Sequence, residues 1–363
     1  MKNILICAAA LCLFTLNVFA ENKIHGSNEF SVNYNNLDGP GKTSSSLTQG
    51  ARYLENLNLY GNGSKNSWNY NYSFGLKATD DKKNDLKTFS LTNLNSKITN
   101  NIHTLNTGDV FESFTRYSLG SPLKGLSYNL SPKNKSSFNI TALHGIAYPR
   151  WDSFWGDPEV KTVKRTVSGI RTKKILTDDI EAGFNYVFTK DTDRQSSSDG
   201  LYDAKTYSFD FEYDPMPGLT VNAERAQSDS DYSSSAGTAY SSSKGHATRI
   251  EAIGDGYPSR VVMEYENVSP YFISLLGSAI SDRRKFKSSW RYNYSKKTTM
   301  NWSFLWYRNN LDSQLTSTTR SWKPQIGIAI KRIFPKRRYS FVDFYYKFDQ
   351  QYGAGQSSSN HYL

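Results

Sequence analysis

The stretch from Lys285 to Arg308 constrains the fold more than any other part of this chain. Large apolar residues occupy most alternate positions on both sides of the polar break at Ser295–Thr298, namely Phe286, Trp290, Tyr292, Tyr294, Met300, Trp302, Phe304 and Trp306. A period of two indicates β-strands, because successive side chains point to opposite faces. The stretch therefore predicts a hairpin with one aromatic face, which either packs on a second sheet or faces lipid.

The first 20 residues resemble a secretory signal. Lys2 is followed by a mostly apolar run, and Val18-Phe19-Ala20 offers small residues for cleavage before Glu21. We expect residues 1–20 to be a cleaved signal peptide and residues 21–363 to form one domain. Both cysteines of the chain, Cys7 and Cys12, fall in the signal. The mature chain would then form no disulfide, no cysteine-ligated metal site and no covalent haem attachment.

Composition favours a membrane barrel over a packed soluble protein. The chain holds 25 Tyr and 20 Phe, and no apolar window of about 18 residues follows the signal, so no transmembrane helix is expected. An exported, aromatic-rich chain built of strands is typical of an outer-membrane β-barrel. The net charge of +11 falls to +10 once Lys2 is removed, and we attribute it to contact with outer-membrane lipid headgroups. Nucleic acid is not an expected partner.

Short polar turns alternate with longer, Ser-, Asp- and Gly-rich connections. The expected turns are 61–64, 93–96, 131–134, 176–179, 214–218, 254–258, 295–298 and 334–338. Bacterial barrels have short periplasmic turns and long extracellular loops. The pattern predicts an all-β fold: a transmembrane antiparallel up-and-down β-barrel of about 18 strands, with 16 as the alternative. The last expected strand, Ser357–Leu363, is short for a membrane strand.

The alternation also assigns side chains to faces. The apolar set would face lipid and the polar set a water-filled lumen, because a barrel of this size is too wide for side chains to fill. The predicted pore-lining residues are Lys285, Lys287, Arg291, Arg249, Arg260, Asp210, Glu212, Glu224 and Glu264. Acidic residues come mainly from the middle strands and basic ones from the Lys285–Arg308 hairpin. They either set a transverse field or are scattered solvated side chains.

Two connections are unusually apolar for loops. Thr107–Pro122 and Tyr148–Trp155 contain several aromatic residues. Each is a candidate for a segment that folds inward and narrows the pore.

Catalytic and metal-binding patterns are missing from the sequence. The five histidines are scattered without metal-ligand spacing, and Ser and Asp are too common here to mark a triad. We therefore predict no catalytic residues, no metal site, no cofactor and no enzymatic activity.

Two short motifs resemble a group of large bacterial outer-membrane barrels. The first runs from Gly108-Asp109-Val110 through Phe114–Leu119 to Leu123-Lys124-Gly125, and the second is Tyr307–Asp312. Some of these barrels are similar to the porin members of porin–cytochrome complexes, which sheathe a multihaem cytochrome in the outer membrane. The resemblance covers a small part of the chain and transfers no functional residue.

Three functions remain open from the sequence. The first is a passive channel for small polar or charged solutes in the outer membrane. The second is a barrel sheath that holds a multihaem cytochrome for electron transfer. The third is a surface barrel whose long loops bind a partner.

Overall fold

Eighteen strands follow one another along the chain in the computed structural model. It describes residues 21–134, 137–147, 150–151, 163–192, 200–234, 240–334, 337, 339–353 and 356–362, so the expected signal peptide lies outside the described residues. The strands are β1 (Glu21–Asn35), β2 (Gly50–Lys65), β3 (Trp68–Thr79), β4 (Phe89–Thr99), β5 (His103–Ser113), β6 (Gly120–Leu130), β7 (Asn139–Ile146), β8 (Lys164–Thr177), β9 (Ile180–Thr192), β10 (Leu201–Met216), β11 (Leu219–Ser233), β12 (Tyr240–Gly256), β13 (Ser259–Val268), β14 (Arg283–Asn293), β15 (Thr298–Asn309), β16 (Arg320–Lys331), β17 (Phe341–Gly353) and β18 (Gln356–Tyr362). A 3-10 turn, η1 (Lys42–Ser44), lies between β1 and β2.

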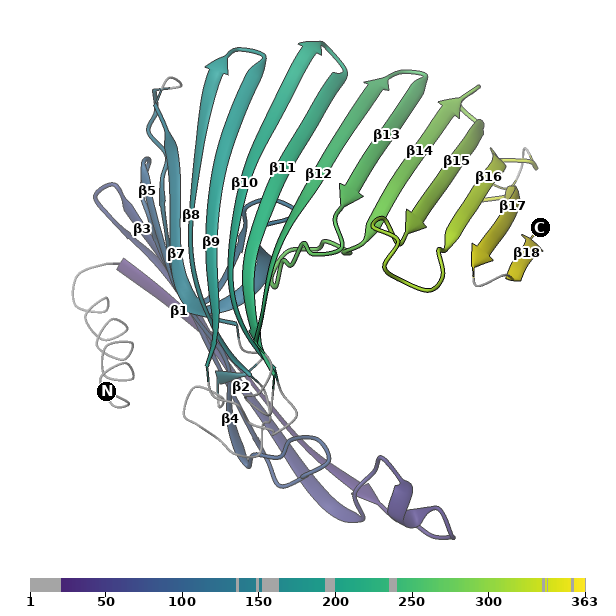
Figure 1. Cartoon of the computed structure of the whole chain (residues 1–363). Helices are drawn as coiled ribbons and strands as arrows, with labels where there is room; N and C mark the ends of the chain where they lie inside the picture. The colour runs from purple at the N-terminus through teal and green to yellow at the C-terminus, as the bar shows by residue number, and fades with distance from the viewer. Residues whose placement is uncertain are drawn as a thin grey trace.

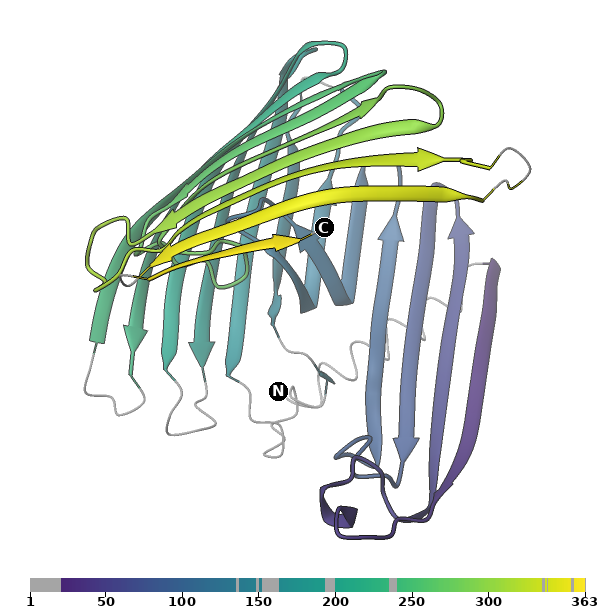
Figure 2. The ribbon, with the colours of Figure 1, turned by 90° about the vertical axis from the view of Figure 1, so that its right-hand side faces the viewer.

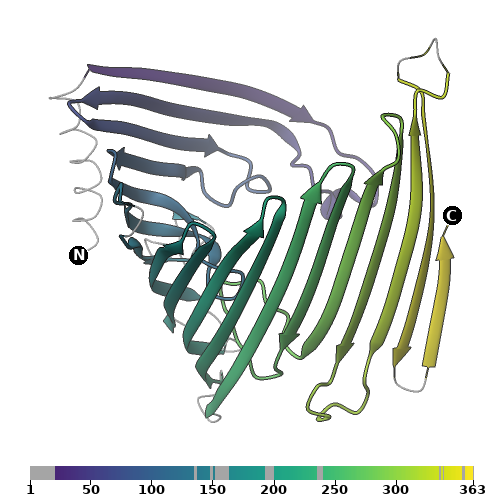
Figure 3. The same cartoon turned by 90° about the horizontal axis from the view of Figure 1, so that it is seen from above.

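Each strand pairs antiparallel with the next one in the chain, from β1–β2 through to β17–β18. The predicted all-β, up-and-down arrangement of 18 strands is confirmed, and the 16-strand alternative is not. The sheet curls into an incomplete cylinder in which β1 and β18 form the two edges (Figures 1, 2 and 3). Among the described residues these two edge strands do not pair with each other.

The connections differ in length between the two ends of the strands. At one end, two residues suffice at 66–67, 178–179, 217–218 and 257–258. Asn66 and Gly218 adopt positive φ there, which suits tight turns. At the other end lie the longer connections 36–49, 269–282 and 310–319. We call these the short-turn end and the long-loop end.

Two predicted turns are wrong. Residues 61–64 lie inside β2 and residues 93–96 inside β4. Both contain good turn formers, but the chain reverses at 66–67 and 100–102 instead. Residues 93–96 pair in register with Tyr72–Gly75 of β3, and the register shifts only beyond them, between Gly75 and Leu76.

The two faces of the sheet differ in chemistry as the pattern predicts. On β16 one face carries only apolar side chains between Arg320 and the short-turn end, and Ile326 remains 59% exposed there. The corresponding face of β17 carries Val342, Phe344, Tyr346 and Phe348. We call this the outer face. The opposite, inner face is the one that the connecting segments 114–119 and 269–282 cover, and the segment after β13 turns into the curl of the sheet (Figure 1). No described helix has the length and apolar character needed to span a membrane.

Candidate functional site: the inner face of the sheet

The nine residues predicted to line a pore all come from five neighbouring strands and lie on the inner face. Asp210 stands opposite Glu224, which stands opposite Arg249. Glu264 stands opposite Lys287. The same parity places the remaining members on this face: Glu212, Arg260, Lys285 and Arg291. That this face borders a pore stays a prediction.

The connection 114–119 between β5 and β6 crosses the inner face. Phe114 and Leu119 are buried in a cluster with inward side chains of four strands: Leu123, Leu143, Val167 and Val187. The hydroxyl of Thr115 lies 3.2 Å from that of Ser208 on β10. The predicted inward folding of Thr107–Pro122 is therefore confirmed for 114–119, whereas 107–113 and 120–122 belong to β5 and β6.

Tyr117 anchors the middle of this segment. Its ring is fully buried among Ala226, Ala247 and Val268, and it meets Phe272 edge-on with ring centroids 5.7 Å apart. Its hydroxyl donates to a carboxylate oxygen of Glu266 at 3.1 Å. Burial raises the pKa of the Tyr117 hydroxyl and the neighbouring Glu266 charge raises it further, so the hydroxyl remains a donor.

A second connection, 269–282 between β13 and β14, is hydrogen-bonded to the first. The backbone amide of Gly120 donates to the carbonyl of Leu276 at 2.9 Å, and that of Ser278 donates to the carbonyl of Arg116 at 2.8 Å. The amide of Ile273 donates to the Ser228 hydroxyl on β11. These backbone bonds, one to Arg116 and one from Gly120 directly after the first connection, join the two connections into one unit. We call it the inner brace (residues 114–119 and 269–282).

A charge network lies under the inner brace. Arg116 reaches Glu264 at 3.3 Å and Glu266 at 3.4 Å. Lys285 binds the same two carboxylates at 3.2 and 2.6 Å. Arg249 pairs with Glu264 at 3.1 Å and with Glu251 at 2.7 Å. Desolvated charges are tolerated when they are paired in this way.

Three of the nine predicted residues are therefore buried. Glu224 and Glu264 are each 7% exposed and Lys285 is 6% exposed. Glu224 accepts the backbone amide of Tyr117 at 3.2 Å. In this arrangement these side chains contact the inner brace or its charge network, and that they line a pore stays a prediction. Asp210 is also engaged, because Arg171 on β8 binds it at 3.0 Å.

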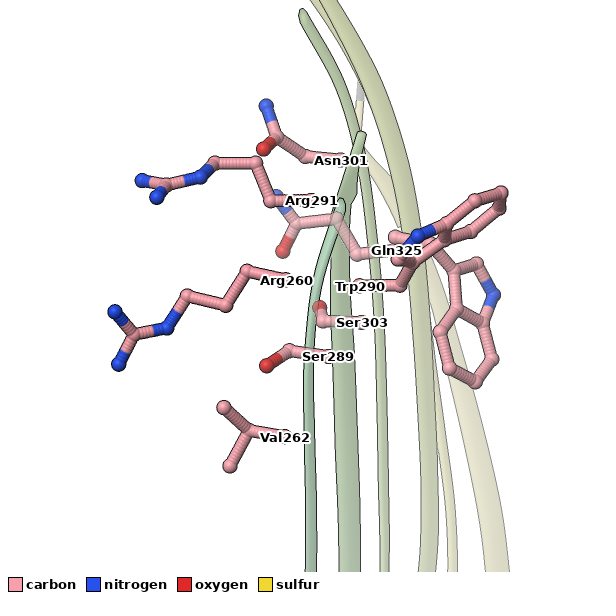
Figure 4. A pocket seen from close by; sticks show the side chains of 9 residues that line it. Arg260, Val262, Ser289, Trp290, Arg291, Asn301, Ser303 and Gln325 are labelled. Carbon is pink, nitrogen blue, oxygen red and sulfur yellow. The ribbon is translucent and has the colours of Figure 1, made fainter. Parts of the chain in front are cut away.

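Exposed cations gather beyond the inner brace, on β13 and β14. Lys287 and Arg291 are exposed, and neither forms an ion pair with a carboxylate among the described residues. Arg260 stands opposite Arg291, and within the described residues its one ion pair is with the half-exposed Asp255, at 2.9 Å. A shallow hollow of about 310 Å³ is lined by Arg260, Arg291, Ser289, Asn301 and Gln325. Figure 4 shows these side chains on one side of the sheet and Trp290 on the other.

The most important residue that the sequence reasoning missed is Arg116. It lies in the connection Thr107–Pro122, which we singled out for its aromatic residues. An arginine within such an apolar segment is itself a signal that acidic partners face it. Glu266 on β13 is likewise not among the nine predicted pore-lining residues. Of the second apolar connection only Arg150 and Trp151 are described, and the Trp151 indole donates to Asp109 at 2.9 Å.

Groups of His, Cys, Asp and Glu that could hold a metal ion do not occur in the part of the chain that the structure describes.

Comparison with known proteins gives weak structural likenesses only. No protein-family model matches the chain, and no curated protein matches it. Similar solved structures include Pseudomonas aeruginosa OccK8 (OprE), with 8% identity, 94% of this chain and 96% of that chain covered, and a TM-score of 0.46. A BenF-like porin from Pseudomonas fluorescens Pf-5 has 9% identity, coverages of 94% and 99%, and a TM-score of 0.46. The anion-selective porin from Comamonas acidovorans has 12% identity, coverages of 80% and 90%, and a TM-score of 0.42. At these values the fold assignment depends on the chain's own strand order.

Proposed function

We propose that the chain forms an outer-membrane channel for passive passage of small polar solutes, with a preference for anions. One observation carries this proposal: along β14–β17 the outer face is predominantly apolar and exposed towards the short-turn end, while the inner face of the same strands is polar and charged. An exposed apolar face opposed to a polar face suits a sheet with lipid on one side and water on the other. A single soluble sheet would leave that apolar face in water.

Closure of the cylinder is part of the proposal. Unpaired backbone groups are not tolerated in hydrocarbon, so β18 and β1 would have to pair in the membrane. Because the number of strands is even, this last pair would be antiparallel, like the other pairs. The inner brace would then narrow the lumen from one side and leave an aqueous path along β14–β17.

The preference for anions follows from the exposed charge. The acids under the inner brace are neutralised by Arg116, Arg249 and Lys285, whereas Lys287 and Arg291 have no carboxylate partner among the described residues. Inward cations outnumber inward acids on β14–β17, where Asp343 is exposed and Asp349 pairs with Lys323. A wall with an excess of one sign raises the local concentration of the opposite ion.

Single-channel recording in a planar bilayer tests the channel directly. We expect discrete, long-lived conductance steps from the full chain. A chain that inserts and yields no steps would overturn the proposal.

The cytochrome sheath remains a second candidate, supported by the resemblance at 108–125 and 307–312. The inner brace occupies space that such a partner would need, and this favours the channel. Co-purification of a haem-staining protein with the chain from its native membrane would reverse this order.

A further inference from the structure

A row of arginines lies on the outer face near the long-loop end. Arg284 on β14 stands directly opposite Arg308 on β15, which stands directly opposite Arg320 on β16. Side chains directly opposite in an antiparallel pair have Cβ atoms roughly 4.5–5.5 Å apart. Three arginine side chains therefore start from adjacent positions on the surface that we propose faces lipid.

None of these three arginines forms an ion pair with a carboxylate of the described residues. The outward positions of β13–β17 alternate with the inner residues, and none of them is Asp or Glu. Arg284 Nε donates to Asn267 Oδ1 at 3.1 Å, and the buried Arg308 Nε has no hydrogen-bond acceptor. Like charges directly opposite each other destabilise a sheet. Anions supplied from outside the chain would relieve this repulsion.

An aromatic row borders the arginines. Phe286, Trp306 and Trp322 stand opposite one another on the same three strands, two residues nearer the short-turn end. On β16 the outer face is then apolar as far as Ile330. Tryptophan rings prefer the level of lipid headgroups, which places the arginines at the level of phosphates.

We propose that Arg284, Arg308 and Arg320 form a binding site for the phosphorylated headgroups of anionic lipids in the leaflet at the long-loop end. The planar guanidinium group binds phosphate through two parallel hydrogen bonds. The acyl chains would lie along Phe286, Trp306 and Trp322. The inference rests on the proposed function, because it takes the outer face to be in contact with lipid.

A lipid fits this row better than a second copy of the chain does. A second copy binding through the same surface would bring arginines against arginines, since the outward positions of β13–β17 hold no acid. A lipid has a charged headgroup at one end and apolar acyl chains at the other. The row of arginines and the neighbouring apolar surface match these two parts.

Native mass spectrometry of the full chain tests the site. The protein, purified in a non-ionic detergent, is titrated with phosphatidylglycerol or with phosphatidylcholine of the same acyl chains. The variant Arg284→Gln/Arg308→Gln/Arg320→Gln is compared with Arg260→Gln/Lys287→Gln/Arg291→Gln, which removes the same charge from the inner face of the same region. Each arginine near a membrane surface contributes roughly a fivefold preference, so the outer variant should bind phosphatidylglycerol on the order of 100-fold more weakly. The inner variant should bind it as the unmodified chain does.

Equal losses in both variants would overturn the inference, because net charge alone would then explain binding. Displacement of the lipid by inorganic phosphate, or dimers that the outer variant abolishes, would also overturn it. Conductance is recorded for both variants in parallel. If the unmodified chain conducts but does not prefer phosphatidylglycerol, this inference fails alone; if it prefers that lipid but does not conduct, only the proposed channel fails.

Discussion

The inner face has two regions that share one alternation pattern and differ in what covers them. Along β10–β13 the inward side chains include small residues, and Ser208, Ala226 and Ala247 are buried under the inner brace. Along β14–β17 they include Lys287, Arg291 and Gln325, which remain exposed. Small inward residues leave room for Tyr117 and Phe272 to reach the wall, whereas long polar ones hold water. Side-chain size as well as polarity thus distinguishes the covered positions of Ser208, Ala226 and Ala247 from the exposed positions of Lys287, Arg291 and Gln325.

The largest effect is expected from removing the anchor of the covered region. Tyr117→Ala deletes a fully buried ring and its hydrogen bond to Glu266, which should cost about 3–5 kcal/mol of brace stability. The single-channel conductance should rise as 114–119 leaves the wall. Tyr345→Ala removes the same side chain from a half-exposed inward position on β17, and should leave thermal stability unchanged. Equal destabilisation by both substitutions would erase the distinction between the two regions.

Two lysines on one strand sharpen the comparison. Lys285→Met leaves Glu264 and Glu266 without their β14 partner, and breaking a buried ion pair costs on the order of 3 kcal/mol. Lys287→Met, two residues away on the same face, removes an exposed charge and should change stability by less than about 0.5 kcal/mol. The temperature at which the folded form loses its characteristic gel mobility measures the stability of both variants. A larger shift for Lys287→Met than for Lys285→Met would contradict the account.

A smaller effect is expected where the second segment touches β12. A Cβ added at Gly245 would lie 2.1 Å from the backbone nitrogen of Phe272. Gly245→Ala therefore has to displace 269–282, which should destabilise the docked segment by about 1–3 kcal/mol. Gly254 on the same strand has open space around it, and Gly254→Ala serves as the control. Limited proteolysis within 269–282 should accelerate for the first variant only. Identical cleavage rates would show that the contact does not hold the segment.

Much of the fold could be predicted from the sequence because alternation is a local property. The hairpin from Lys285 to Arg308 forms β14 and β15, and its break lies in the connection 294–297. The turns at 61–64 and 93–96 were misplaced because strand pairing overrides local turn propensity. Residues such as Asn62 and Asn95 pair across the ladder instead of turning.

The site was predictable only in part, because burial on the inner face depends on contacts distant in sequence. Glu264 and Lys287 are both charged residues at inward positions of neighbouring strands, and the alternation pattern alone does not distinguish their burial. Only the position of Arg116, which comes from a connection 148 residues away from Glu264 along the chain, shows that one is buried and the other exposed. The pairing of 114–119 with 269–282 likewise has no local signal.

The reversal potential across a planar bilayer under a KCl gradient tests the central claim most directly. The account predicts an anion-favouring potential for the unmodified chain, and a shift towards cations for Lys287→Glu/Arg291→Glu without loss of folding. An unchanged potential in a folded, conducting variant would show that the exposed cations of β14 do not line the path, and would contradict the account.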